Sequence, residues 1–170
     1  MERIKVNAIM ESGAHDIVIP AQMIGANPIR DTKGSKSGYV WHDVKGNTIQ
    51  NKGESDMQGS SLDGIPLKFV AQVSDEVTKL IMSVRKAVKK GNMVIFGADM
   101  NAIKRIAKGD SIEENVIVDH KTGTKSIVRD ENGMYVYPMI IRRKKKTGDP
   151  MDIGMVQERE SDKLDEWSPF

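Results

Sequence analysis

Alternation of apolar and polar residues predicts that this chain is built mainly from β-strands. In segment 4–10, Ile4, Val6, Ala8 and Met10 fall on one side, as in a strand buried on one face. The same alternation predicts a strand at 67–73. Shorter apolar segments predict further strands at 17–19, 39–41, 48–49, 93–96, 115–119, 125–128 and 134–141. Strands 39–41 and 48–49 are expected to form a hairpin that turns near Gly46.

Helical spacing is confined to two short segments. The segment 83–90 keeps Val84 and Val88 on one face with lysine and arginine on the other, and Gly91 follows it as an end signal. Spacing of three residues predicts a weaker helix at 100–107. Many short strands with glycine-containing turns and one or two short helices are typical of a mainly β protein. We therefore expect a small closed β-barrel.

Composition narrows the class of protein. The chain has 170 residues, 26 Lys and Arg against 24 Asp and Glu, and no cysteine, which excludes disulfides, thiol nucleophiles and cysteine-ligated zinc. His15, His42 and His120 lack metal-ligand spacing, so no metal or other cofactor is expected. No apolar run approaches the roughly 20 residues that span a bilayer, so no membrane partner is expected. We expect an intracellular, cytoplasmic protein.

Charge divides the chain into a domain at 1–141 and a charged flexible tail or linker at 142–170. The tail opens with the basic run Arg142, Arg143, Lys144, Lys145 and Lys146 and ends in an acidic stretch at 158–166. The balanced net charge of +2 makes a nucleic-acid partner unlikely for the domain. A weak contact of the basic run with nucleic acid (RNA), a contact with anionic lipid, and a merely solvated domain edge are the alternatives for that run. Trp167 and Phe170 are expected to be exposed.

The candidate catalytic residues lie together just after the first predicted strand. Glu11, Ser12, Gly13 and Ala14 place a carboxylate, a hydroxyl and a glycine at the end of a half-buried strand. Glycine allows a sharp turn there, and the serine is able to form hydrogen bonds across a facing group. An ordinary turn is the alternative interpretation of the same residues.

The wider sequence resembles the retropepsin-like aspartic proteases of copia-type retrotransposon polyproteins. The strand, the E-S-G-A turn and the next strand resemble the D-[ST]-G-A active-site turn of that family. In the same order, residues 80–84, 91–96 and 132–136 are similar to its L-L-S-V, G-x-x-V-x-F and N-G-x-Y-x-L segments, and residues 34–54 are similar to its flap region. The resemblance covers roughly residues 4–141.

The resemblance implies an acid-protease fold, a homodimer and an extended peptide or polyprotein substrate. Each chain would supply one carboxylate, here Glu11, with Ser12, Gly13 and Ala14 supporting the pair. The flap would close over the substrate, and two residues before the helix, Ile81 and Met82, would brace the turn. The flap residues implied are Asp43, Val44, Lys45, Gly46 and Asn47.

The family's catalytic residue is aspartate, whereas this chain has Glu11. The added methylene moves the carboxyl group by about 1.5 Å, and a displacement of this size lowers the rate of catalysis on the order of 100-fold. Three hypotheses follow: an aspartic-type endopeptidase, a catalytically inactive dimeric peptide-binding or assembly domain of a retroelement polyprotein, and a small β-domain in which E-S-G-A is only a turn.

Overall fold

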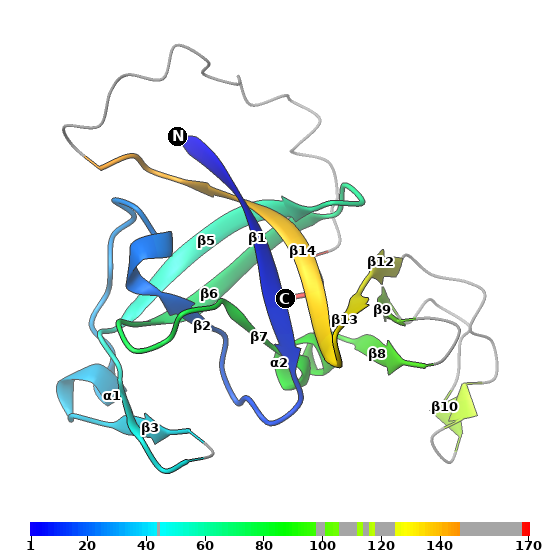
Figure 1. Cartoon of the computed structure of the whole chain (residues 1–170), viewed down its shortest axis with the longest axis horizontal. Coiled ribbons are helices and arrows are strands. Elements are labelled where there is room, and N and C mark those ends of the chain that lie inside the picture. Colours follow the sequence, from blue (N-terminus) through cyan, green and yellow to red (C-terminus); the bar gives the residue numbers. More distant parts are fainter. Residues whose placement is uncertain (44, 98–100, 106–111, 114–115, 118–124, 147–167) are drawn as a thin grey trace.

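The computed structural model is a mainly β protein whose largest sheet closes on itself (Figure 1). It describes the whole chain except residues 44, 98–100, 106–111, 114–115, 118–124 and 147–167. The expected mainly β class with a closed barrel is therefore confirmed. Two short α-helices, α1 (Lys33–Lys36) and α2 (Val84–Lys89), and the 3₁₀ turn η1 (Ala21–Met23) accompany the strands.

Six strands form the barrel in the order β1, β7, β2, β6, β5 and β14, and β14 pairs back onto β1. Their bounds are β1 Glu2–Glu11, β2 Val18–Pro20, β5 Glu54–Ser61, β6 Pro66–Ser74, β7 Ile81–Ser83 and β14 Met134–Arg143. A seventh strand, β13 (Arg129–Glu131), pairs with β14 through a tight turn at Asn132 and Gly133, both with positive φ. Closure gives β14 partners on both sides, with β1 on one edge and β5 and β13 on the other.

The barrel interior holds the hydrophobic core. Inward positions of β1 and β6 alternate as the sequence predicts, with Val6, Ala8 and Met10 on β1 and Leu67, Phe69, Ala71 and Val73 on β6 all buried. Tyr137, Met139 and Ile141 on β14 complete the opposite wall. The core side chains thus come from the first strand, the last strand and the long hairpin between them.

The remaining strands form small satellite sheets. The hairpin of β3 (Val40–His42) and β4 (Thr48–Gln50) is one, and β10 (Ile112–Glu113) with β11 (Val116–Ile117) is another. A three-stranded sheet joins β8 (Asn92–Phe96), β9 (Asn101–Arg105) and β12 (Lys125–Ile127). It contacts the barrel through Phe96, whose ring stacks on Tyr135 with 4.1 Å between the centroids.

One expected element is wrong, and one strand of the barrel was not expected. Residues 101–105 form strand β9 between β8 and β12 instead of a helix, because Ile103 is buried against both neighbours. The predicted strands near 115–119 and 125–128 correspond to β11, which pairs with β10, and to β12, which pairs with β9. Residues 118–124, between these two strands, lie outside the described residues. Strand β5, which the pattern did not indicate, supplies the partner of β6.

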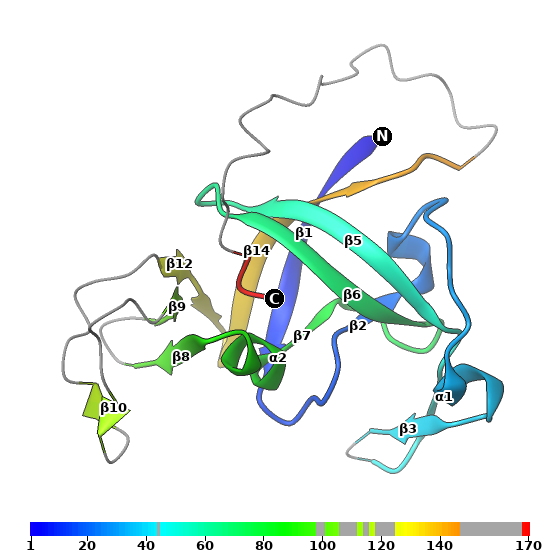
Figure 2. The same ribbon diagram turned by 180° about the vertical axis from the view of Figure 1, so that it is seen from behind.

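The predicted tail is partly folded. Strand β14 continues through Arg143, two residues beyond the expected boundary, and the last three residues pack on the barrel (Figure 2). Phe170 is only 6% exposed and lies against Tyr137. The buried side chain of Asn92 donates a 3.0 Å hydrogen bond to the carbonyl of Pro169. The expectation that Phe170 is exposed is therefore wrong, and Trp167 lies outside the described residues.

Candidate functional site

The E-S-G-A turn begins where two parallel strands end together. Glu11 is the last residue of β1 and lies opposite Ser83, the last residue of β7. The preceding pairs are Ile9 with Ile81 and Met10 with Met82. Ile81 and Met82, the two residues expected to brace the turn, therefore lie on the strand directly beside it, and Met82 is fully buried.

Ser83 connects the turn to the start of α2. Its hydroxyl donates a 2.7 Å hydrogen bond to the carbonyl of Ala14 and caps the helix by accepting from the Lys86 amide at 3.2 Å. This serine is fully buried, and losing such a cap typically costs about 1 kcal/mol. An ion pair of 3.4 Å between Lys86 and Asp16 adds a second link between the turn and α2. The turn is therefore held from behind by the helix.

The functional groups of the turn point away from the core. Glu11, Ser12 and Gly13 are all exposed, and Glu11 Oε1 accepts a 3.1 Å hydrogen bond from the Gly13 amide. Ser12 has no hydrogen bond to another described residue in the single chain. Gly13 does not have a positive φ, so the sharp turn does not depend on its being glycine. A Cβ there would lie 3.4 Å from Glu11 Oε1, close to the carboxylate itself.

The β3–β4 hairpin has its tip where the sequence predicts. The carboxylate of Asp43 accepts hydrogen bonds from the Lys45 amide at 2.8 Å, the Asn47 amide at 2.9 Å and the Asn47 side chain at 2.8 Å. These bonds, those from Asn47 first, hold the pKa of Asp43 below its ordinary value. Gly46 has a φ of +83°, which favours glycine, and Val44 lies outside the described residues.

The hairpin projects from the same end of the barrel as the turn after β1 (Figure 1). Among the described residues of one chain, no hydrogen bond joins the hairpin to this turn. Trp41 packs edge-on against Tyr39 with 6.1 Å between the ring centroids, so its ring is part of the packing of the hairpin itself.

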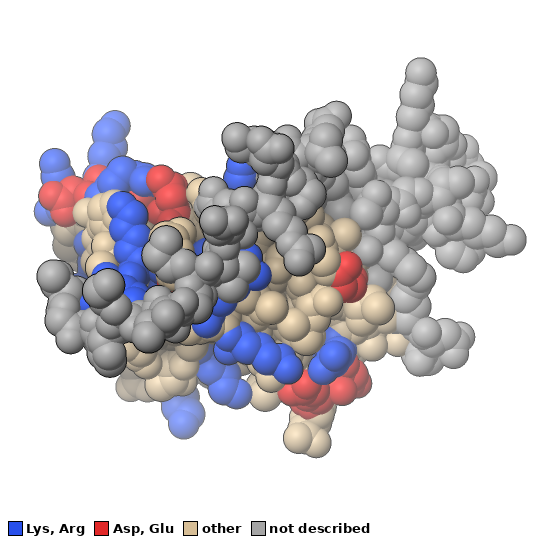
Figure 3. Space-filling model, turned by 90° about the horizontal axis from the view of Figure 1, so that it is seen from above, with Lys and Arg blue, Asp and Glu red and all other residues tan. Residues whose placement is uncertain are grey.

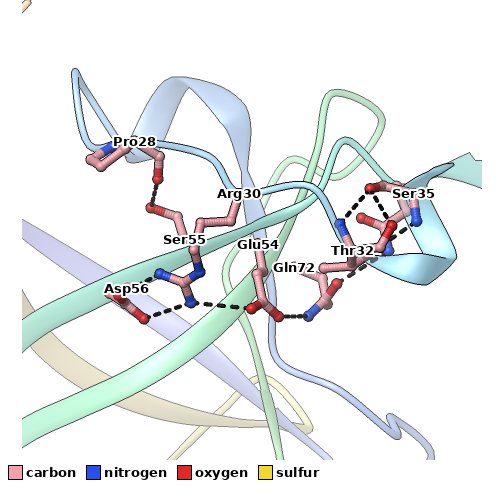
Figure 4. Close-up of polar contacts among 9 residues, drawn as sticks. Pro28, Arg30, Thr32, Ser35, Glu54, Ser55, Asp56 and Gln72 are labelled. Carbon is pink, nitrogen blue, oxygen red and sulfur yellow. Dashed lines mark hydrogen bonds and ion pairs between the residues drawn. The ribbon is translucent and has the colours of Figure 1, made fainter.

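A polar cluster fixes the segment that leads into the hairpin (Figure 4). The Arg30 guanidinium donates to Asp56 Oδ1 at 2.9 Å and to Glu54 Oε1 at 3.1 Å, and Gln72 donates to the other oxygen of Glu54 at 3.3 Å. Hydrogen bonds from Arg30 lower the pKa of Asp56. The cluster ties the chain before α1 to strands β5 and β6. It was not predicted, because its members are separated widely in sequence.

A second polar cluster lies where the β12 strand meets the barrel. Ser126 is fully buried and hydrogen-bonds both Asp63 Oδ1, at 2.9 Å, and the Tyr137 hydroxyl, at 2.7 Å. Asp63 also accepts from the hydroxyl of Ser61 and, at 2.8 Å, from the Ile127 amide. Burial raises the pKa of Tyr137 to about 12. All polar atoms of this cluster have partners, so its arrangement is that of a structural network.

The basic run belongs in part to the fold. Arg143 donates to Glu2 at 2.7 Å and to the carbonyls of Gln22 and Met23, and the Lys144 amide donates to Asn27 at 2.8 Å. Within the described part of the chain, no three acidic or histidine side chains gather to hold a metal ion. No helix there is long and apolar enough to cross a bilayer.

Comparisons of this chain with protein-family models, with curated proteins and with solved structures found no match.

Proposed function

We propose that the chain is a homodimeric endopeptidase of the retropepsin-like aspartic type, in which the turns at 11–14 of two copies form one active site. The observation that carries the proposal is the parallel pairing of β1 with β7, which leaves Glu11 exposed and ties its turn to α2 through Ser83. The closed barrel and the hairpin at the same end support it. The order of E-S-G-A turn, hairpin, second strand and helix matches the resemblance described above.

Two carboxyl groups brought close together would share one proton, because both cannot ionise at short range. The ionised Glu11 would take a proton from a water molecule, whose oxygen forms a bond to the scissile carbonyl carbon. The protonated Glu11 of the second copy would donate its proton to the carbonyl oxygen. Collapse of this intermediate breaks the C–N bond, and the departing nitrogen receives a proton from the dyad. The reaction needs no metal.

The β3–β4 hairpin would cover an extended peptide held by main-chain hydrogen bonds. The hydrogen bonds that Asp43 accepts from Lys45 and Asn47 support this role, because they link the two sides of the hairpin while the hairpin extends from the barrel. Polyprotein segments are the substrate class that the resemblance implies.

The second candidate function is a dimeric peptide-binding or assembly domain without catalysis. It is favoured by Glu11 itself, whose longer side chain turns back and accepts from the Gly13 amide of its own turn.

Peptide-library cleavage separates the two candidates. The wild-type chain, Glu11→Asp and Glu11→Gln are assayed at mildly acidic to neutral pH with matched folding controls. Cleavage by the wild type or Glu11→Asp, and none by Glu11→Gln, is the expected result. Peptide binding without cleavage in all three proteins would assign the second function instead.

A crosslink tests the shared site independently of activity. Because the chain has no cysteine, Ser12→Cys introduces a single thiol at the turn. Two such residues facing each other across a dimer axis would form a disulfide under mild oxidation, which requires Cα atoms about 4.4–6.8 Å apart. Ser37→Cys, exposed at the end of α1, is the matched control. A dimer that crosslinks no better through residue 12 than through residue 37 contradicts the proposal.

A further inference from the structure

Residues 168–170 dock on the barrel in the way that a bound peptide would, and we call them the docking segment. The Ser168 hydroxyl accepts a 3.1 Å hydrogen bond from the Lys68 amide and donates a 3.2 Å bond to the Lys68 carbonyl. One side chain thus pairs with both main-chain groups of a β6 residue, whereas β2 pairs with residues 72–74 of the same strand. Contact with the main chain of a strand is a common mode of peptide recognition.

The two residues after Ser168 are buried in the barrel. Pro169 is fully buried, and its carbonyl accepts a 3.0 Å hydrogen bond from the side-chain amide of Asn92. The Phe170 ring belongs to the hydrophobic core, and its centroid lies 5.7 Å from that of the Tyr137 ring. Figure 2 shows the docking segment, in red, beside β14. Three consecutive residues therefore contact three different elements, namely β6, β8 and β14.

The residues that receive the docking segment are positioned by the rest of the fold. Lys68, Asn92 and Tyr137 lie on strands that pair with β5, β9 and β1, and we call these three residues the acceptor site. A hollow of about 360 Å³ lies beside Phe170, with Lys68 and Lys90 at its border. Because Phe170 itself lines this hollow, the docking segment is able to leave and return on that side without opening the barrel.

The connection to the docking segment is long enough to reach a neighbouring barrel. Residues 147–167 join it to the basic run. A segment of this length spans roughly 70 Å when fully extended. A domain of this size is only about 40 Å across. The length of the connection therefore does not restrict the docking segment to the barrel of its own chain.

We propose that the acceptor site also binds residues 168–170 of a second copy of this chain. Every copy carries the Ser-Pro-Phe sequence, so an exchanged segment makes the same three contacts and only the covalent connection differs. Exchange of an identical element between protomers is a low-cost route to association. It is favoured when copies are held in one assembly, because the local concentration of foreign segments then matches that of a chain's own segment. The proposal does not depend on the protease activity proposed above.

The surface charge does not oppose the approach of a second copy. The net charge is only +2, and Figure 3 shows both acidic and basic side chains on the described surface seen from above. A net charge far from zero keeps proteins apart, and this chain does not have one. The affinity of the exchange is therefore set by the contacts of the docking segment.

Titration of a peptide into a chain with an emptied acceptor site tests the proposal. The acceptor variant is the full chain with Ser168→Gly, Pro169→Gly and Phe170→Gly, labelled with ¹⁵N. The peptide has the sequence of residues 165–170 with both ends blocked. The NMR signals of the Asn92 side-chain amide report binding, because this group donates to the Pro169 carbonyl. A segment that stays docked at an effective concentration of about 1 mM in its own chain should bind in trans with a Kd of about 0.1 mM or tighter.

Two comparisons identify the contacts responsible. The same peptide with Phe170→Ala should bind at least about tenfold more weakly, because it lacks the ring that packs on Tyr137. The wild-type chain should also bind the unchanged peptide at least about tenfold more weakly than the acceptor variant does, because its own segment competes. Equal affinity in either comparison, or no binding of the unchanged peptide, would overturn the proposal.

Exchange between whole chains is measured from the same signals. Unlabelled wild-type chain at about 1 mM should fill roughly half of the sites of the ¹⁵N-labelled acceptor variant and move the Asn92 signals in the direction that the peptide moves them. The unlabelled acceptor variant is the matched control and should leave these signals unmoved. Signals that respond to the peptide and not to the wild-type chain would confine docking to a chain's own segment and refute exchange.

A milder variant guards against misfolding of the acceptor variant. Phe170→Ala keeps the rest of the docking segment, and binding to it is measured through stability. A ligand that binds only the folded chain raises the ratio of folded to unfolded molecules up to about elevenfold at ten times its Kd. The unchanged peptide at about 1 mM should therefore raise the urea midpoint of Phe170→Ala, and the peptide with Phe170→Ala should not. A midpoint that neither peptide changes would contradict docking in trans.

Discussion

Replacing Phe170 by alanine tests whether the end of the chain is part of the barrel core. The Phe170 side chain is 6% exposed, belongs to the core cluster and meets the Tyr137 ring at a centroid distance of 5.7 Å. Truncating a phenylalanine in a fixed core typically costs about 3–5 kcal/mol. The last three residues are short and are able to leave the barrel together, and they regain chain entropy when they do. We therefore expect a smaller loss, about 2–3 kcal/mol.

Urea unfolding followed by circular dichroism measures this loss. With a slope of about 2 kcal/mol per molar urea, the midpoint should fall by roughly 1–1.5 M. Val88→Ala is the control, because Val88 is 52% exposed on α2 and its truncation should change stability by less than about 0.5 kcal/mol. A Phe170→Ala midpoint equal to that of Val88→Ala would refute the packing of residues 168–170 as a stabilising contact.

Three further predictions concern the buried tyrosine of the core, the tip of the β3–β4 hairpin and a glycine in the barrel wall. Burial raises the pKa of Tyr137 to about 12, above the value near 10 of an unfolded tyrosine. The contribution of its protonated hydroxyl to the free energy of unfolding is therefore complete below pH about 10 and is lost as pH rises through 12. Tyr137→Phe should remove roughly 1 kcal/mol of the loss of stability between pH 8 and 11, as measured by urea unfolding. The lowered pKa of Asp43 means that its hydrogen bonds stabilise the hairpin above the ordinary carboxyl pKa and are lost as pH falls through the lowered value. Asp43→Ala should therefore speed exchange of the Asn47 amide hydrogen at neutral pH, and an unchanged rate would show that the carboxylate does not order the tip. Gly59→Ala should lower stability in thermal unfolding by about 3 kcal/mol or more, because the added Cβ would lie 2.0 Å from a carbonyl oxygen of β14. Gly64→Ala is the control: the added Cβ meets open space but the φ is +85°, so it should cost only about 1 kcal/mol. Equal losses of stability in the two variants would contradict the steric argument.

Strands with one buried face could be predicted from the sequence, because their residues alternate. Strand β6 follows this rule over its whole length, from Leu67 to Val73. Strand β5 does not, since its inward positions include the buried Ser55 and its sequence is mostly polar. Ser55 is satisfied by a 2.9 Å hydrogen bond to the Pro28 carbonyl, a contact that no local pattern reveals.

Short segments with few apolar residues were predicted less well. In 101–105 one buried residue, Ile103, decides the structure, and its spacing from neighbouring apolar residues is equally compatible with a helical turn. The last three residues follow a charged stretch, so nothing in the local sequence indicates that Phe170 contacts Tyr137. Pairing with distant strands overrode the local preference in the first case, and long-range packing did so in the second.

The turn carrying Glu11 was located from its residue types, whereas its supports were found only in the structure. Ser83 was expected near the start of a helix, yet its hydrogen bond to Ala14 joins residues 69 positions apart. Glycine at position 13 was expected to permit a special backbone angle, and its φ is ordinary. Residue types thus indicate candidate chemistry, and the contacts that orient it depend on tertiary structure.

The pairing of β1 with β14 has a consequence for folding kinetics. Glu2 lies opposite Arg143, so the barrel cannot close until almost the whole described domain has left the ribosome. Contacts between such distant residues slow folding, because a long loop must be ordered before they form. Until then β1 presents an open edge that other chains can join. Nascent chains in which β14 has not yet been synthesised are therefore the species in which aggregation competes with folding, and a chaperone that shields β1 would act during that interval.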